Sequence, residues 1–159
     1  MVFVFDNDPK LERSTRWQRR RAVARGEFLS AEAFCRRRGV SLARLETLMH
    51  QGAVFTVTIA GSQYYPAVLA SVRGVRLSRL NRICRQLAPL PAWLRYDALS
   101  TCRESLGGKV VVQVLRRGAG YRRARWYAGA TVAAEEADAL IRARLRSVPR
   151  AVKVNLADL

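Results

Sequence analysis

Residues 29–52 read LSAEAFCRRRGVSLARLETLMHQG, and this stretch decides the fold. Ser30 comes directly before one run with helical spacing, 31–38, and Ser41 comes directly before a second run, 42–51. Serine is a favoured N-cap residue, and a glycine follows each run at the position where helices commonly end. Two short helices joined by a glycine-containing turn form a helix–turn–helix.

The second of these helices carries an apolar stripe. We expect four of its residues to face the core because they recur at helical spacing: Leu42, Leu45, Leu48 and Met49. Residues 53–59 are rich in β-branched side chains, and the turn residues 60–63 separate them from 64–66. This pattern is typical of a β-hairpin that ends at a proline. Helix, turn, helix and hairpin in this order predict a winged helix–turn–helix.

The rest of the chain is predicted to be mostly helical. Helical spacing recurs in four further stretches: 9–25, 67–87 with a break near Gly74, 93–102 and 132–146. We expect Trp17 in the first of these to contact the core. Gly118 and Gly120 indicate a connecting turn over 121–127, with Trp126 in the core. Residues 110–115 are ambiguous, because their β-branched side chains suggest a strand among helical surroundings.

The predicted fold class is mainly α with a small β-hairpin wing: a winged helix–turn–helix followed by a C-terminal helical subdomain. We expect four parts along the chain, namely an N-terminal basic helix or arm, the winged helix–turn–helix, the helical subdomain and a tail. Their ranges are 1–28, 29–72, 73–148 and 149–159. Residues 1–8 are expected to form a short strand or an ordered tail, and the last ten residues a strand or a loose tail.

The charge of the chain points to a polyanionic or acidic partner. Its 159 residues carry 29 Lys and Arg against 12 Asp and Glu, a net charge of +17, and most of the cations are arginine. Arginine binds phosphate and guanine through two parallel hydrogen bonds. GC-rich coding also favours arginine over lysine, but it does not explain the shortage of carboxylates. Self-repulsion at this charge destabilises a compact chain unless an anionic partner relieves it.

Two stretches resemble known families. Residues 29–66, through LSAEAFCRRRGVS, HQGAVFTV and GSQYYPA, resemble the small winged helix–turn–helix domains of MerR and excisionase type. The later run PAWL…SLGGKVVVQVLRRG is similar to the toxin-binding domain of Xre/MbcA/ParS-type antitoxins, where a Trp–Leu pair precedes Leu–Gly–Gly and a short helix. The second resemblance implies a helix at 110–117 and a protein partner such as a toxin.

The first resemblance implies that 42–51 is a recognition helix in the major groove of DNA. Its expected DNA-contacting positions are Ser41, Arg44, Thr47, His50 and Gln51. The hairpin tip is expected to contact the backbone or the minor groove through Ser62, Gln63 and Tyr64. Flanking phosphate contacts are expected from Arg37, Arg38, Arg73, Arg76 and Arg79. The alternative is an ordinary amphipathic helix packed inside a larger domain.

Two other functions remain open from the sequence. In a protein-interaction module, as the second resemblance implies, the partner would contact an exposed apolar patch and its adjoining turn: Trp93, Leu106, Gly107, Gly108 and Val111. In an RNA-binding protein, residues 116–127 would act instead, because arginines interleaved with aromatic side chains suit stacking on unpaired bases.

Catalytic and metal chemistry have little support in the sequence. Ser, His and Asp are too sparse for a credible triad, and Gly107-Gly108-Lys109 lacks the flanking residues of a phosphate-binding loop. Three widely spaced cysteines and one histidine do not form a zinc set, so we expect buried, reduced thiols. The longest uncharged stretch, 52–72, is too polar to span a bilayer, and the first residues do not form a secretory signal.

The sequence therefore predicts a cytoplasmic helix–turn–helix protein of bacterial type that binds double-stranded DNA. We expect a transcriptional regulator or an antitoxin-like protein that forms a homodimer, with no enzyme activity, no cofactor and no membrane partner.

Overall fold

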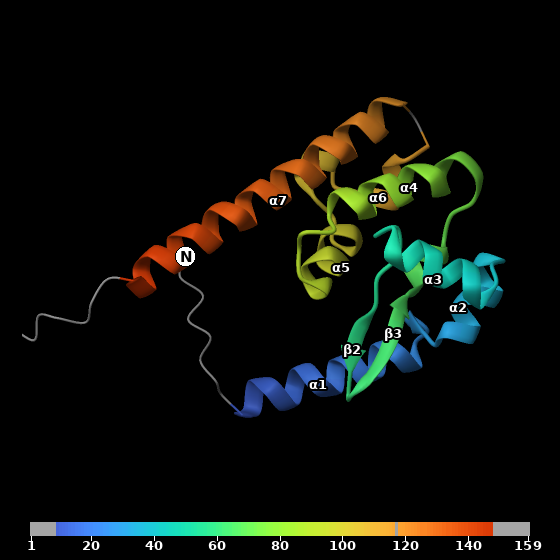
Figure 1. The fold of residues 1–159 in the computed structure, drawn as a ribbon, viewed down its shortest axis with the longest axis horizontal. Coiled ribbons are helices and arrows are strands. Elements are labelled where there is room, and N and C mark those ends of the chain that lie inside the picture. Colours follow the sequence, from blue (N-terminus) through green and yellow to red (C-terminus); the bar gives the residue numbers. More distant parts are fainter. Residues whose placement is uncertain (1–8, 117, 148–159) are drawn as a thin grey trace, which may run out of the picture.

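The computed structural model describes residues 9–116 and 118–147 (Figure 1). The elements follow in the order α1 (Pro9–Ala24), β1 (Phe28–Leu29), α2 (Ala31–Arg38), α3 (Leu42–His50), β2 (Val57–Ile59), β3 (Ser62–Pro66), the 3-10 helix η1 (Ala67–Ala70), α4 (Gly74–Gln86), α5 (Ala92–Ser100), the 3-10 helix η2 (Glu104–Leu106), α6 (Val111–Val114) and α7 (Gly118–Ser147). The chain is mainly helical with one small sheet, which confirms the predicted fold class. The expectations for 1–8 and 149–159 lie outside the described residues.

The two helices of the helix–turn–helix begin where the serine caps predict. The Ser30 hydroxyl accepts a hydrogen bond from the backbone N–H of Ala33 at 3.2 Å, and the Ser41 hydroxyl accepts one from that of Arg44 at 3.2 Å. Gly39 ends α2 in the left-handed region, at φ 74°, which glycine adopts without strain. The α3 helix ends one residue before its predicted end, and the next residue is its C-cap.

The sheet has three antiparallel strands in the order β1–β3–β2. The β2 and β3 strands form the predicted hairpin through a two-residue turn, in which Ala60 has φ 52° and Gly61 has φ 83°. Two positive φ angles are typical of a type I′ turn, whose twist suits a hairpin. The β2 strand is shorter than predicted, because residues 53–56 form a connection whose side chains Ala53, Val54 and Phe55 pack into the core.

One hydrophobic core joins the winged part to the C-terminal helices. Its buried residues run from Ala22 to Ala128 in a single cluster. The Phe28 ring of β1 lies 5.6 Å from that of Trp93 and 4.7 Å from that of Tyr96, centroid to centroid, so α5 packs directly on the sheet. The α4 helix contributes Leu80, Ile83 and Cys84 to this core, and its C-cap, Leu87, is buried as well.

The expected stripe of α3 is only partly correct. Leu45 and Leu48 are buried and Met49 is half-buried, but Leu42 is 55% exposed. At 100° per residue, Leu42 lies about 90° from the midpoint between Leu45 and Leu48, so it falls at the edge of the buried face. Trp17 of α1 is exposed as well, and does not join the core.

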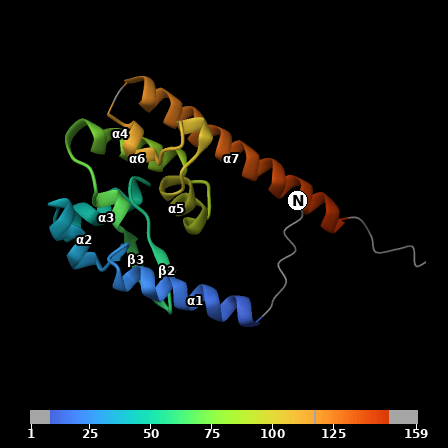
Figure 2. The same ribbon diagram turned by 180° about the vertical axis from the view of Figure 1, so that it is seen from behind.

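The connecting turn predicted over 121–127 is wrong. Residues 118–147 form one helix, α7, which crosses α4 and α6 and then extends past α5 (Figures 1 and 2). Trp126 is 67% exposed, while its neighbours Ala124, Tyr127 and Ala128 are buried. The glycines expected to interrupt the chain lie in the first turn of α7. Residues 111–114 form the short helix α6, as the antitoxin resemblance implies at this position.

The three cysteines differ in exposure. Cys35 and Cys84 are buried, as expected, but Cys102 is exposed after α5. Burial raises the pKa of the Cys84 thiol to about 12, so this group stays protonated. Because the thiolate is the reactive form, we expect an aromatic disulfide reagent at about pH 8 to label Cys102 quickly and Cys84 only after unfolding.

Counting labelled thiols in native and urea-unfolded protein checks this prediction. The native Cys102→Ser variant should lose the fast labelling phase. Fast labelling of Cys84 in the native protein would contradict the burial described here.

Candidate nucleic-acid interface

The outward side of α3 is open to solvent. All five residues expected at the DNA are exposed: Ser41, Arg44, Thr47, His50 and Gln51. Leu45 and Leu48 anchor the opposite side in the core, so the helix cannot rotate without exposing them. Within residues 9–116 and 118–147, no other helix covers this side of α3.

Local hydrogen bonds position two of these side chains. The Thr47 hydroxyl donates to the carbonyl of Ala43 at 3.1 Å, within the helix. Arg85 of α4 donates from Nη2 to Oε1 of Gln51 at 3.2 Å. The amide nitrogen of Gln51 remains a donor, since the bond to Arg85 uses its carbonyl oxygen. Glu46 is also exposed on this helix and is an unfavourable neighbour for phosphate.

Exposed arginines gather beside the helix–turn–helix turn. Arg37 lies in the last turn of α2, Arg44 lies in the first turn of α3, and Arg73 immediately precedes α4. The Arg73 guanidinium donates to the backbone carbonyl of Arg37 and, at 3.0 Å, to that of Ala70. These bonds hold Arg73 next to the end of α2. We call Arg37, Arg44 and Arg73 the turn arginines.

Arg38 is not available to a ligand. It is only 5% exposed, and its guanidinium donates to the Leu69 carbonyl at 2.9 Å and to Oδ1 of Asn81 at 2.7 Å. Burial, and to a smaller degree the nearby charges of Arg73 and Arg44, lower the pKa of this group. The expected phosphate contact at Arg38 is therefore wrong, because this side chain connects α2 to η1 and α4.

The wing tip lies beside α1 (Figures 1 and 2). Ser62 and Gln63 are exposed and Tyr64 is half-buried. The hairpin residues 58–61 line a pocket together with three cations of α1: Arg16, Arg19 and Arg20. Sequence reasoning left these α1 arginines out of the expected site. Their helical spacing and the excess of positive charge over 1–25 were the available signals.

The arginines of α4 divide by role. Arg79 is half-buried, donates to the Leu115 carbonyl at 2.6 Å and lies over the Tyr121 ring at 5.2 Å. It therefore joins α4 to α6 and α7, and the expected phosphate contact from it is not supported. Arg76 is half-buried and lines a surface pocket with Lys109 and Arg116.

The expected apolar patch for a protein partner is absent from the part of the chain that the structure describes. Leu106 and Val111 are buried because η2 and α6 fold back against α7. Trp93 is half-buried beneath the guanidinium of Arg19, 4.3 Å from its ring centre. Gly107 and Gly108 are exposed, with φ 69° and 70°, and form a tight turn.

The acidic side chains of α5 and η2 lie on separate elements. Asp97 of α5 pairs with Arg103 at 2.6 Å, and the nearby carboxylate of Glu104 belongs to a different element, η2. Over residues 9–116 and 118–147, no three His, Cys, Asp or Glu side chains lie close enough together to hold a metal ion. None of the helices in these ranges combines the length and apolar character needed to cross a membrane.

The element order α1–β1–α2–α3–β2–β3 and the exposed α3 define a winged helix–turn–helix with an added helical part. Comparison of the chain with models of protein families, with curated proteins and with solved structures found no match. The resemblances to the MerR, excisionase and antitoxin families therefore stay predictions.

Proposed function

We propose that this chain is a cytoplasmic protein that binds double-stranded DNA and acts as a transcriptional regulator. The recognition helix α3 enters the major groove, where Arg44 reaches a base edge, and the other two turn arginines, Arg37 and Arg73, contact the backbone beside it. The observation that carries this proposal is the open side of α3, with Leu45 and Leu48 fixed in the core and Arg44 free to reach outward.

The local charge supports this arrangement. The N-terminus of α3 carries the positive end of the helix dipole, and Arg37, Arg44 and Arg73 add three cations around it. Phosphate contacts of this kind fix the register of a helix on the duplex, whereas base-edge contacts give sequence preference. Arg44 is suited to guanine, and the amide of Gln51 to adenine.

The test starts from duplexes selected out of a random library by the purified protein. Fluorescence polarisation on a selected duplex should show that Arg44→Ala weakens binding by about 5- to 150-fold, which is the effect of losing one two-bond base contact. Arg37→Ala should weaken binding to all duplexes similarly and reduce the slope of log K against log salt by about one.

The matched control is Arg125→Ala, which removes the same charge from an exposed position on α7. Its affinity for the selected duplex should stay near that of the parent protein. Equal losses for Arg44→Ala and Arg125→Ala would contradict a reading role for α3. Absence of duplex binding at low salt would refute the function itself.

One observation favours a second candidate, single-stranded RNA. Trp126 is exposed on the first half of α7, among the exposed Arg122, Arg123 and Arg125. An exposed indole beside guanidinium groups is a stacking surface for an unpaired base. This candidate predicts the reverse of the result above: Arg125→Ala and Trp126→Ala weaken binding to single-stranded RNA, and Arg44→Ala does not.

A further inference from the structure

The second half of α7 is largely exposed in the part of the chain that the structure describes, since residues 136–144 are all exposed. It extends past α5 in both views (Figures 1 and 2). Leu140 is 72% exposed and Ile141 is 57% exposed. A helical segment with little tertiary packing is marginal in water, and contiguous large apolar side chains on a surface mark an interaction site.

A groove leads onto this exposed segment. It lies between α5 and α7, and its apolar lining includes Leu94, Ala98 and Ala134. On α7, the positions Tyr127, Thr131, Ala134 and Asp138 line the groove at helical spacing, and Ile141 continues the same face beyond it. The groove and Ile141 therefore form one continuous strip along α7, and Leu140 borders it, about 100° away around the helix.

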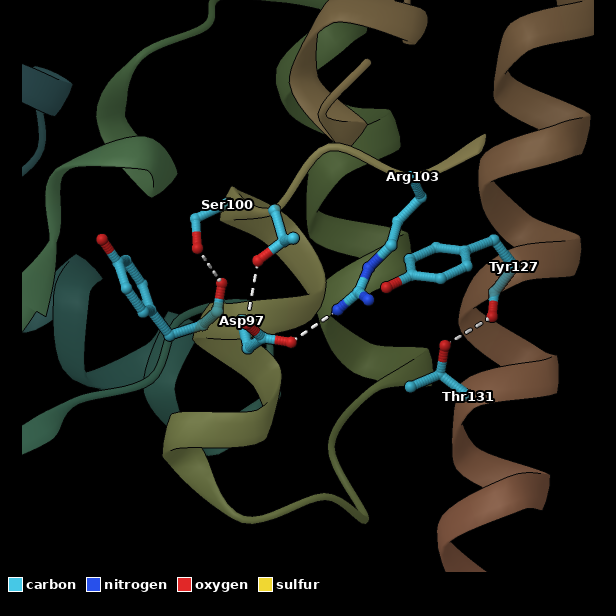
Figure 3. A network of polar contacts seen from close by, with 7 residues as sticks. Asp97, Ser100, Arg103, Tyr127 and Thr131 are labelled. Atoms are coloured by element: carbon cyan, nitrogen blue, oxygen red, sulfur yellow. Dashed lines mark hydrogen bonds and ion pairs between the residues drawn. The ribbon is translucent and has the colours of Figure 1, made fainter. Parts of the chain in front are cut away.

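The charges beside this strip are unusual for the chain. Although the protein carries +17, the groove is lined by three carboxylates, Asp97, Glu135 and Asp138, with Arg103 as its one cation. Figure 3 shows the α5 end of the groove, where Asp97 holds Arg103 across from Tyr127 and Thr131. An occupant of this groove should therefore be an apolar helix edged with positive charge.

The last turns of α7 have that composition. After its acidic middle, the helix continues through Leu140 and Ile141 and then carries three exposed cations, Arg142, Arg144 and Arg146. Two α7 helices placed antiparallel would set the cationic end of each against the acidic middle of the other. Within one chain Arg142 pairs with Glu135, but exposed pairs of this kind contribute little and exchange partners readily.

We propose that a second copy of this chain covers the strip, and that α7 is the interface of a homodimer. The two α7 helices pack antiparallel about a two-fold axis near Leu140 and Ile141, and the cationic end of each helix lies in the acidic groove of the other subunit. A two-fold interface uses the same surface on both subunits, which fits a single helix carrying both halves of the charge pattern. This dimer does not depend on nucleic-acid binding.

Light scattering coupled to size exclusion tests the proposal on the full chain, in salt high enough to remove nucleic acid. The expected mass is twice the 17.9 kDa of one chain. The double variant Leu140→Glu, Ile141→Glu should elute as a monomer. Its circular dichroism spectrum should stay that of the folded parent protein. Val75→Glu, which alters an exposed apolar residue on α4, is the matched control and should remain dimeric.

Charge reversal tests the antiparallel arrangement. One variant carries Glu135→Arg and Glu136→Arg, and the other carries Arg142→Glu and Arg144→Glu. Each alone should be monomeric, because like charges then face each other across the axis, and an equimolar mixture should recover the dimer mass. A monomeric parent protein, or a dimer that survives the Leu140 and Ile141 substitutions, would overturn the proposal. Failure of the mixture to pair would overturn the antiparallel geometry.

Discussion

Replacement of Gly120 by alanine is expected to destabilise the protein by about 3 kcal/mol or more, the upper range for forcing atoms into a packed interior. A Cβ atom at this position would lie 2.1 Å from the carbonyl oxygen of Val114 and 3.1 Å from its carbonyl carbon. Both are backbone atoms of α6, so no side-chain rotation relieves the overlap. The first turn of α7 must then move away from α6.

Urea unfolding followed by circular dichroism measures this effect, and Gly118→Ala is its control. A Cβ atom at Gly118 would meet only the Nη1 atom of Arg122, at 3.9 Å. Because alanine is the better helix former, Gly118→Ala should be neutral or stabilise the protein by up to about 1 kcal/mol. Equal losses of unfolding free energy for Gly118→Ala and Gly120→Ala would mean that α7 does not approach α6 closely.

Replacement of Arg38 by alanine is expected to cost about 3 kcal/mol of unfolding free energy, since it removes a buried charged group together with its hydrogen bonds. The change leaves the Leu69 carbonyl and the Asn81 amide oxygen without their bonds to this side chain, and it opens space beside Phe34. Arg38→Lys should not restore stability, because a single ammonium does not match the two acceptors that the planar guanidinium reaches.

The adjacent arginines provide the control for Arg38. Arg36→Ala and Arg37→Ala remove the same side chain from exposed positions, so each should change stability by no more than about 0.5 kcal/mol. Under the proposed function, duplex affinity and stability respond to different positions: Arg37→Ala weakens duplex binding although its free energy of unfolding hardly changes. A stable Arg38→Ala protein that had lost affinity for duplex would instead place Arg38 at the ligand.

Local signals in the sequence were enough to predict the helix–turn–helix and its hairpin. Ser30 and Ser41 cap their helices through hydrogen bonds to residues three positions further on. The hairpin turn likewise depends only on neighbouring residues, 60–61. The β1 strand was missed because Phe28–Leu29 is too short for any alternation to appear. Its partner in the sheet, Pro66, lies far along the chain, so only the tertiary fold selects the pairing.

The wrong predictions for Gly120 and Arg38 have the same physical origin: in both places tertiary contacts determine the structure. Gly120 suggested an interruption, but it is a point of close helix approach, which the sequence alone does not distinguish from a turn. The run Arg36–Arg38 predicts a charged helix end in any case. Arg38 follows Phe34 by one helical turn and so shares its buried face, and this spacing was the available signal for its burial.

The hydrogen bonds of α4 connect the helix–turn–helix to the C-terminal helices. Asn81 holds Arg38, and Arg85 holds Gln51, while Arg73 at the start of α4 holds the end of α2. The α4 helix is thus bonded to α2 and α3 and also packs against α7. Under the proposed function, an event that shifts α4 changes the geometry that α3 offers to a duplex, and by thermodynamic reciprocity duplex binding shifts the same equilibrium of α4.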